Sequence, residues 1–397
     1  MANVLVAGGG IGGLSAALAC ARAGHRVSIH ERAQEVIEVG AGVQLGSNVV
    51  KILYGWGLQE ALGAVAAFPE QLTVRNAITG SKLGVLRFGK TFAQRYGAPY
   101  LTIHRADLHS VLLNAVCHYA HIEMHMDSAL MGVQQTSQGV TADFVNVRRS
   151  QGDLLVGADG GWSMVRKLIW KDGTPQPTGH LAYRAMVRQS ELPERLRSSH
   201  VTAWLGPQMH VVQYPVRRGA WLNVVAIVHG HVKGDMSHWD HSANARDIQH
   251  SLNETCGSLR DLVAAVPHWR LWPLSIRPPM AGAAEQAVGC IALLGDAAHP
   301  MVPYLAQGAG MAIEDASALA WALGEARPGT GPDIEAKLKV YAQARWQRNA
   351  QVQARAIKNG EIFHATGLMR WGRDAALRLL GKNLLDMPWL YGGKAHP

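Results

Sequence analysis

The chain has few charged residues, few cysteines and no long apolar run. Charged residues make up 17% of its 397 residues and hydrophobic residues 48%, a balance that excludes a disordered protein and favours a globular enzyme. No apolar run approaches the roughly 20 residues that a membrane helix needs, and the first ten residues lack the basic and apolar regions of a signal peptide. We therefore expect a cytoplasmic protein that does not bind membranes.

The cysteines are scattered singly, without a CxxC pair or a histidine at ligand spacing. This arrangement favours structural burial over disulfides or metal ligation, so we predict no metal site. The four positions are Cys20, Cys117, Cys256 and Cys290.

The net charge of +9 is dispersed along the chain. Adjacent basic pairs such as Arg148-Arg149 and Arg217-Arg218 stand alone, and there is no basic tail. Dispersed charge argues against nucleic acid as a partner and favours attraction of small anions such as carboxylates and nicotinamide dinucleotides.

The first thirty residues predict a strand, a glycine turn, a helix and a second strand. An apolar run at 3–7 precedes Gly8, Gly10 and Gly13, a helical pattern follows to residue 23, and 26–30 is apolar again. In this GxGxxG pattern the first glycine permits the turn, the second lets a pyrophosphate approach, and the third lets helix and strand pack. Glu31 ends the second strand, where a carboxylate can accept hydrogen bonds from ribose hydroxyls. The unit predicts a bound dinucleotide, and by itself leaves NAD and FAD open.

Two later segments favour FAD over NAD as the bound dinucleotide. Residues 155–166 place Asp159-Gly160 after an apolar strand, and 291–300 place Asp296 at the end of another strand. Asp296 can hold a ribityl hydroxyl. The segment Gly308-Ala309-Gly310 opens the next helix, whose amino terminus can meet the pyrimidine edge of a flavin and stabilise negative charge there.

The middle of the chain has the residue pattern of antiparallel strands. Residues 211–214 and 221–228 read as antiparallel strands joined at Arg218-Gly219, within a block that interrupts the dinucleotide domain. We predict an α/β dinucleotide-binding domain with an inserted α+β domain. The expected segments are 1–72, 101–180 and 278–345 for the dinucleotide domain, 73–100 and 181–277 for the inserted domain, and 346–397 as a helical carboxy-terminal segment.

Together these motifs resemble the class A flavoprotein aromatic hydroxylases, the group of salicylate, 3-hydroxybenzoate and 6-hydroxynicotinate monooxygenases. The resemblance covers about residues 3–345 and implies a Rossmann-like FAD-binding domain with a mixed-sheet substrate domain, as in p-hydroxybenzoate hydroxylase. It implies that the first segment, with Arg32, binds the ADP half of FAD, that the Asp159 segment lies near the pyrophosphate, and that Asp296 lies at the ribityl chain. It also places Arg105 at the FAD phosphates and Gln44 near the isoalloxazine.

The same resemblance suggests the substrate side. The segment 209–215 is similar to a strand that faces the flavin in 3-hydroxybenzoate 6-hydroxylases, and alternation along a strand points His210, Val212 and Tyr214 the same way. An imidazole near pKa ~6.5 is a suitable acceptor for a phenol proton. Tyr304, in the loop before the flavin-contacting helix, is either a substrate contact or a packed aromatic. Some relatives carry glutamine or histidine where this chain has Pro303 or Tyr304, which leaves the ring and the attacked position open.

The resemblance implies that NADH or NADPH reduces FAD, that oxygen adds at flavin C4a, and that the hydroperoxide delivers OH to the substrate ring. We expect a small aromatic acid, 3-hydroxybenzoate ahead of salicylate and 6-hydroxynicotinate, whose hydroxylation would be decarboxylating if the attacked carbon bears the carboxylate. Alternatives of another class are a lipid-directed flavin reductase or epoxidase and a binding protein without chemistry. Residues 346–397 are expected to pack over the FAD domain or to contribute to a homodimer.

Overall fold

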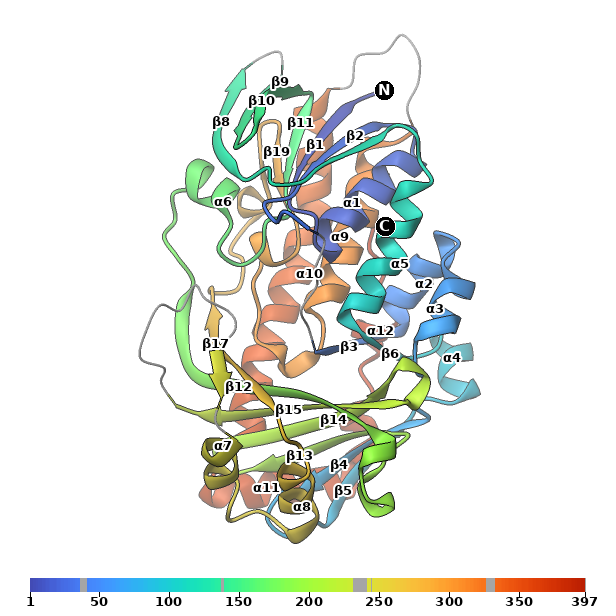
Figure 1. Cartoon of the computed structure of the whole chain (residues 1–397), viewed down its shortest axis with the longest axis vertical. Coiled ribbons are helices and arrows are strands. Elements are labelled where there is room, and N and C mark those ends of the chain that lie inside the picture. Colours follow the sequence, from blue (N-terminus) through green and yellow to red (C-terminus); the bar gives the residue numbers. More distant parts are fainter. Residues whose placement is uncertain (36–40, 137–138, 231–240, 244, 326–332, 397) are drawn as a thin grey trace.

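The computed structural model describes residues 1–35, 41–136, 139–230, 241–243, 245–325 and 333–396. Figure 1 shows two layered regions, one above the other, with a long helix running between them. The upper region holds both ends of the glycine-turn unit, and the lower region is a broad sheet with short helices on its far side. This arrangement confirms the predicted fold, a dinucleotide domain with an inserted sheet domain.

The upper region is built on a six-stranded sheet that is parallel except at one edge. Its order is β18-β19-β11-β1-β2-β7, and only β18 runs antiparallel to its neighbour. The strands are β1 (Asn3–Ala7), β2 (Arg26–His30), β7 (Ile122–His125), β11 (Leu154–Gly157), β18 (Ala287–Val288) and β19 (Ile291–Leu293). The central strands are buried apolar runs, as expected for a parallel sheet covered on both faces.

Helices and a small sheet cover these two faces. A three-stranded antiparallel sheet, β10-β9-β8, packs beside α6, while α1 packs against α5 and α9. The elements are α1 (Ile11–Arg22), α5 (Arg105–Cys117), α6 (Met164–Ile169), α9 (Gly308–Leu323), β8 (Leu130–Thr136), β9 (Gly139–Phe144) and β10 (Val147–Gly152). The helices expected up to residue 23 and from Gly308 onward are therefore present, with slightly different ends.

The lower region is an eight-stranded mixed sheet of order β16-β17-β12-β15-β14-β13-β4-β5. Every neighbouring pair is antiparallel except β13 and β4. The strands are β4 (Gln71–Asn76), β5 (Lys82–Arg87), β12 (Gln176–Arg188), β13 (Val201–Gly206), β14 (Met209–Val216), β15 (Trp221–His229), β16 (His241–Ala243) and β17 (Trp269–Ile276). The predicted hairpin is confirmed, and its turn residues Arg218 and Gly219 have φ of 57° and 88°.

The two faces of this sheet pack against different partners. Odd-numbered residues of β14, such as Val211, pack with α7 (Ala245–Ser251) and α8 (Gly257–Ala264), whereas Tyr214 packs toward the dinucleotide domain. A short ribbon of β3 (Gly42–Leu45) and β6 (Leu101–His104) lies between the domains, beside α2 (Ser47–Gly55), α3 (Gln59–Val65) and α4 (Lys90–Tyr96).

The carboxy-terminal segment connects both regions. Helix α10 (Ile334–Phe363) packs along α9 and ends at the lower sheet, where α11 (Gly367–Leu385) packs on β5 and is followed by α12 (Pro388–Tyr391). Segment 346–397 therefore contacts both domains. None of the helices in the described ranges has the length and apolar character needed to span a bilayer.

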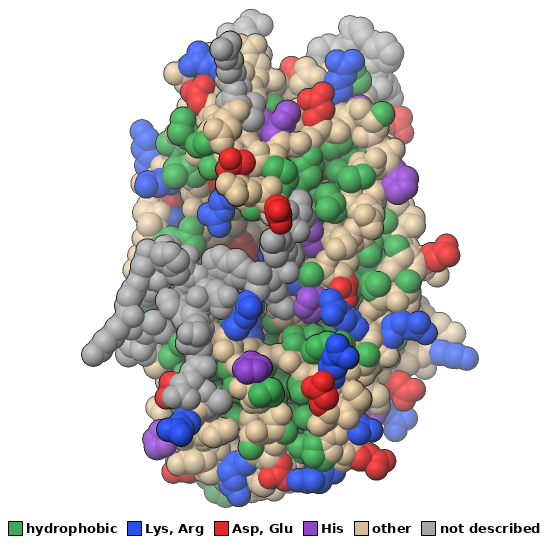
Figure 2. Space-filling view, viewed as in Figure 1, with side chains coloured by type: hydrophobic (Ala, Val, Ile, Leu, Met, Phe, Trp, Pro, Cys, Tyr) green, Lys and Arg blue, Asp and Glu red, His purple; other side chains and the backbone are tan. Residues whose placement is uncertain are grey.

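The charges of the described residues are mixed over the face shown in Figure 2. Lys and Arg side chains alternate there with Asp and Glu, and no continuous basic stripe crosses this face. This distribution agrees with the dispersed charge of the sequence.

Candidate functional site

The glycine turn between β1 and α1 leaves open space at the amino terminus of the helix. Gly8 has φ of 107°, and a Cβ there would lie 2.5 Å from the carbonyl oxygen of Ala158. A Cβ on Gly13 would collide with the carbonyl oxygen of Gly8. A Cβ on Gly10, by contrast, would meet nothing within 4 Å. Gly8 and Gly13 are thus required by the fold itself, whereas the space at Gly10 suits a pyrophosphate held by the helix dipole.

Glu31 lies at the end of β2 and closes one side of this turn. Its Oε2 accepts a hydrogen bond from the N–H of Gly9 at 2.6 Å, and its Oε1 accepts from the N–H of Ala33 at 2.8 Å. The neighbouring Arg32 is exposed. The carboxylate is held at the edge of the turn, where a ribose bound along the strand would lie.

The second motif, residues 155–166, is stabilised by hydrogen bonds to the side chain of Asp159. Asp159 Oδ2 accepts hydrogen bonds from the N–H groups of Met164 at 2.7 Å and Val165 at 3.1 Å, which caps the short helix α6. Its Oδ1 is buried and meets no hydrogen-bond partner among the described residues, and burial raises the pKa of this carboxyl. Arg166 donates to the carbonyl of Ala298 and so ties this motif to the third one. An orphaned buried oxygen at this point fits a site that is completed by a bound group.

The third motif, residues 291–300 with Asp296, contacts a network of buried charged side chains on α9 and α10. Asp315 Oδ2 accepts hydrogen bonds from the N–H of Gly295 at 3.1 Å and from His299 Nε2 at 2.6 Å, while Oδ1 accepts from Arg345 Nε at 2.7 Å. Burial alone would raise the pKa of Asp315, but His299 and Arg345 more than offset it and hold this pKa below its usual range. Asp296, one residue along the same turn, is exposed.

The residues predicted for the flavin end lie at the start of α9, on β3 and at the start of α5. The helix begins at Gly308, and a Cβ there would lie 3.9 Å from Asp296 Oδ1. Gln44 lies on β3 and accepts a hydrogen bond from the hydroxyl of Tyr100 at 2.8 Å. Arg105 opens α5, with its N–H bonded to the carbonyl of Ala41. The predicted cofactor residues thus come from the ends of β1, β2, β11 and β19, from β3 and from two helix termini.

The lower sheet presents one row of side chains toward these residues. His210, Val212 and Tyr214 share this face of β14, as alternation predicts, and pairing carries the row across β15 to β12. Val212 pairs with Val225, and Val225 pairs with Arg184, so Arg184 lies on the same face near the middle of the row. His210 and Tyr214 are four residues apart, about 13 Å along the strand, so a small ring meets both only through its opposite ends.

His210 is buried in a cluster of histidines. Only 2% of it is exposed, and its Nδ1 lies 2.7 Å from Nε2 of His364. Burial, and to a smaller degree the charge of His180, lowers the pKa of His210 to about 3. The imidazole is therefore neutral at physiological pH, and its Nε2 remains for a proton-donating substrate.

Both predicted tyrosines use their hydroxyls within the protein. Tyr214 donates a hydrogen bond to the carbonyl of Gly42 at 2.6 Å, which ties β14 to β3. The hydroxyl of Tyr304 lies 2.5 Å from Nδ1 of His180, and its ring meets that of His210 edge to face at 5.0 Å. Burial raises the pKa of both phenols, so each keeps its proton. Each can orient a ligand, and neither is a proton acceptor.

Arg184 is a candidate site residue that no motif of the sequence indicates. Its guanidinium carbon lies 4.9 Å from the ring centroid of Trp272, and its Nε is buried without a hydrogen-bond partner in the described part of the chain. Burial lowers the pKa of Arg184. The charges of Tyr214 and Asp296 raise this pKa, whereas the charge of Arg105 lowers it. The guanidinium of Arg184 is therefore close enough to residues of both domains to interact with their charges.

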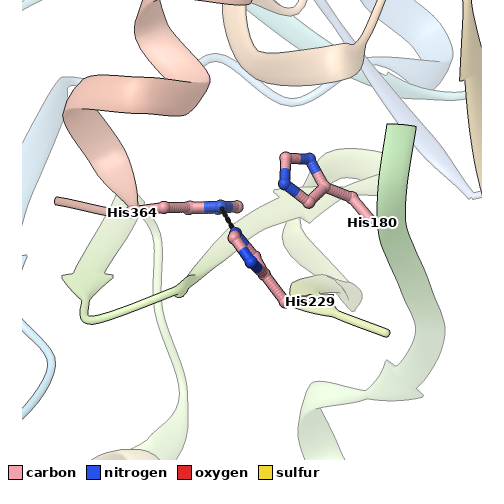
Figure 3. Close-up of side chains that lie close together, drawn as sticks. All are labelled: His180, His229 and His364. Carbon is pink, nitrogen blue, oxygen red and sulfur yellow. Dashed lines mark hydrogen bonds between the residues drawn. The ribbon is translucent and has the colours of Figure 1, made fainter. Parts of the chain in front are cut away.

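The histidine cluster was missed as well. His180, His229 and His364 lie within reach of one metal ion, since their ligand atoms are within 4.8 Å of one another (Figure 3). However, His364 already uses both ring nitrogens, toward His210 and toward His229, so an ion would have to displace a hydrogen bond. No local pattern signals this cluster, because its members lie on β12, β15 and at the end of α10.

Comparison with known proteins gives a family match and close relatives. A model of the family described as FAD binding domain matches residues 1–356. The 3-hydroxybenzoate 6-hydroxylase of Polaromonas naphthalenivorans (strain CJ2) is 35% identical over 392 residues, which cover 98% of this chain and 95% of the relative. A 3-amino-4-hydroxybenzoate 2-monooxygenase of Streptomyces platensis is 33% identical, with 100% and 97% covered.

Solved structures agree with the sequence relatives. A salicylate hydroxylase substrate complex superposes with a TM-score of 0.83 at 25% identity, covering 99% of this chain and 96% of that one. HpxO of Klebsiella pneumoniae, solved with FAD and uric acid, has the same fold, with a TM-score of 0.82 at 24% identity over 95% of this chain and 92% of HpxO.

Proposed function

This chain belongs to the FAD binding domain family of flavin monooxygenases, and on that premise we propose that it hydroxylates a small hydroxylated aromatic acid with NAD(P)H and O2. We take 3-hydroxybenzoate as the substrate and the carbon para to its hydroxyl as the attacked position. The observation that carries the proposal is one sheet face that presents a buried neutral histidine, His210, and a cation, Arg184, toward the dinucleotide domain.

FAD fits the cradle that the chain provides. We assign Gly8, Gly10, Gly13, Glu31 and Arg32 to its adenylate half. Further along the cofactor, Arg105 and Asp159 would meet the pyrophosphate, Asp296 the ribityl chain, and Gln44 with Gly308, Ala309 and Gly310 the isoalloxazine. The open space at Gly10 supports the assignment of the adenylate half. FAD supplies the redox chemistry and oxygen activation, which no protein side chain can provide.

The protein contributes orientation and one proton transfer. His210 Nε2 would accept the phenol proton, because its Nδ1 is committed to His364. Removing that proton raises the electron density of the ring at the attacked carbon. Arg184 would hold the carboxylate, since its Nε has no other hydrogen-bond partner among the described residues. The ring then lies over Val212, between His210 and Tyr214.

The tyrosines would shape this pocket. Tyr214 fixes β3 against the sheet through Gly42, and so holds Gln44 in place. Tyr304 covers His210 and keeps water from its ring. Exclusion of water matters because a buried proton acceptor is selective only when solvent does not compete with the substrate.

The remaining partners are part of the proposal. NADH or NADPH is the electron donor, and the net charge of +9 attracts both this dinucleotide and the aromatic acid. We also propose a homodimer in the cytoplasm. Apolar side chains of α11 stand exposed on the surface, namely Leu368, Met369, Trp371, Leu379 and Leu380. Light scattering of the purified protein measures the subunit number.

The proposal is tested by supplying purified protein with NADH, NADPH and a panel of hydroxybenzoates and hydroxypyridine acids. We expect a yellow protein whose oxidation of NADH and consumption of O2 rise on adding 3-hydroxybenzoate. If salicylate or 6-hydroxynicotinate stimulates NADH oxidation and 3-hydroxybenzoate does not, that compound is the substrate in place of 3-hydroxybenzoate. A colourless protein, or one that no aromatic acid stimulates, would contradict the proposed function.

A further inference from the structure

A continuous row of imidazoles connects the buried His210 to the surface. His210 Nδ1 lies 2.7 Å from His364 Nε2, and His364 Nδ1 lies 3.0 Å from His229 Nε2. His210 is 2% exposed and His364 6%, whereas His229, at the end of β15, is exposed. Figure 3 shows the last of these contacts, with the ring of His364 directed from the end of α10 onto that of His229.

We propose that His364 and His229 form a proton relay that carries the substrate's phenolic proton from His210 to solvent. This inference rests on the proposed function, because it needs a phenol at His210. His210 is then the catalytic residue, while His364 and His229 act through it.

The relay is required because the buried end cannot keep a proton. Burial lowers the pKa of His364 to about 2, with further lowering by His210, His180 and His229. An imidazolium at His210 or His364 is therefore unfavourable, and a proton taken from a phenol would return at once. Only where water solvates the charge, at His229, can the proton leave.

The transfers balance with all three rings neutral before and after. At the start each ring carries its proton on Nδ1, so that His210 donates to His364 and His364 donates to His229. As the substrate O–H breaks, His210 Nε2 gains that proton and its Nδ1 proton passes to His364 Nε2. His364 passes its Nδ1 proton to His229 Nε2, and His229 releases its Nδ1 proton to water. The same path in reverse reprotonates the product and restores the tautomers.

The surroundings favour transfer over trapping of charge. His180 packs against the relay, with its ring centroid 4.4 Å from that of His229, but its Nδ1 is occupied by the hydroxyl of Tyr304. Arg373 adds a positive charge near His364, and it is paired with Asp374. Among the described residues these sources of charge disfavour a lasting imidazolium and leave the neutral relay intact.

The test uses the intact holoenzyme, mixed anaerobically with 3-hydroxybenzoate in weak buffer with a pH-indicator dye. Stopped-flow absorbance then follows proton release and phenolate formation, without any turnover. For His364→Phe and His229→Ala we expect both rates to fall about 100-fold, within the range of general acid–base effects. Bound FAD is measured in every variant, and His268→Ala, an exposed histidine on the same domain, is the matched control and should match wild type.

Added imidazole separates a relay from a structural role. It should restore proton release in His229→Ala, where solvent reaches the gap, and should not restore it in His364→Phe. Wild-type proton release in His229→Ala would overturn the relay, even if His364→Phe proved unstable. A stoichiometric metal in the purified protein that is lost in His229→Ala would also overturn it, because a ligated nitrogen cannot pass a proton.

The relay and the proposed function fail differently. If wild-type enzyme hydroxylates 3-hydroxybenzoate while the variants release protons normally, only the relay is wrong. If wild type neither binds nor hydroxylates any phenol of the panel, the proposed function is wrong, and the relay falls with it.

Discussion

The guanidinium of Arg184 lies over the ring of Trp272, with its central carbon 4.9 Å from the ring centroid. The two residues come from neighbouring strands of the lower sheet, β12 and β17. A cation–π contact orients the guanidinium without neutralising its charge, so the charge can still pair with an anionic ligand.

Arg184 is expected to set the preference for aromatic acids. Arg184→Met keeps the length of the side chain and removes the charge, and should raise KM for 3-hydroxybenzoate about 10- to 100-fold, as expected for a charged hydrogen bond. KM for 3-methylphenol, which lacks the carboxylate, should stay unchanged. Steady-state kinetics with both compounds measures the difference, and an equal loss for both would remove Arg184 from carboxylate recognition.

His210 is expected to act on chemistry and not on cofactor binding. His210→Phe should slow hydroxylation about 100-fold, within the range of general base effects, and divert NADH oxidation toward peroxide. The FAD content should remain that of wild type, because His210 lies on the substrate sheet. Product and peroxide are quantified together, and fully coupled turnover in this variant would exclude His210 as the proton acceptor.

Alanine substitutions of Gly10 and Gly13 should affect different properties, FAD binding for Gly10 and stability for Gly13. Gly10→Ala meets no atom within 4 Å, so this variant should fold normally but bind FAD weakly, because the added methyl occupies the space assigned to the pyrophosphate. Gly13→Ala collides with the carbonyl of Gly8 and should lower the stability of the apoprotein. Thermal unfolding of apoprotein and flavin fluorescence titration separate the two effects. Wild-type FAD affinity in Gly10→Ala would place the cofactor elsewhere.

Arg345 is expected to hold the third motif together. It is fully buried between Glu314 and Asp315, so Arg345→Met leaves buried carboxylates without their partner and should cost about 3–5 kcal/mol of stability. Lys339→Met, on the same helix, removes only an exposed pair with Glu335 and should change nothing measurable. Urea unfolding compares the two variants. Equal stability would show that the network is dispensable.

The buried histidines should make the fold acid-sensitive. The pKa of His210 is about 3 in the folded protein, against ~6.5 when unfolded. As pH falls below about 6.5, the unfolded chain binds a proton that the folded protein does not. At pH 5 this linkage removes roughly 2 kcal/mol for His210 alone. Unfolding curves at pH 7 and pH 5 for wild type and His210→Phe test this, and a variant with the same loss as wild type would contradict it.

The sequence predicted those parts of the fold whose causes are local. The turn at Gly8 and Gly13, the position of Glu31 after β2 and the helix start at Gly308 follow from residues adjacent in the chain, and the structure places each element there. The alternation of His210 and Tyr214 along β14 is equally local. Their roles remain predictions.

Arg184 and His364 could not be found in this way. Arg184 and Val212 share a sheet face because β15 lies between β12 and β14 and pairs with both. The residues of β12 and β14 alone do not predict this strand order. His364 reaches His210 because α10 is 30 residues long and ends at the lower sheet. The segment expected to pack over the FAD domain or to contribute to a homodimer thus also brings His364 into contact with His210.

The central claim is that this chain inserts one atom of molecular oxygen into an aromatic acid. The most direct measurement is mass spectrometry of the product formed from 3-hydroxybenzoate, NADH and isotopically labelled O2. The account predicts a dihydroxybenzoate that carries one labelled oxygen atom in the new hydroxyl group. Oxidation of NADH that yields only peroxide with every aromatic acid tried, or a product without the label, would contradict it.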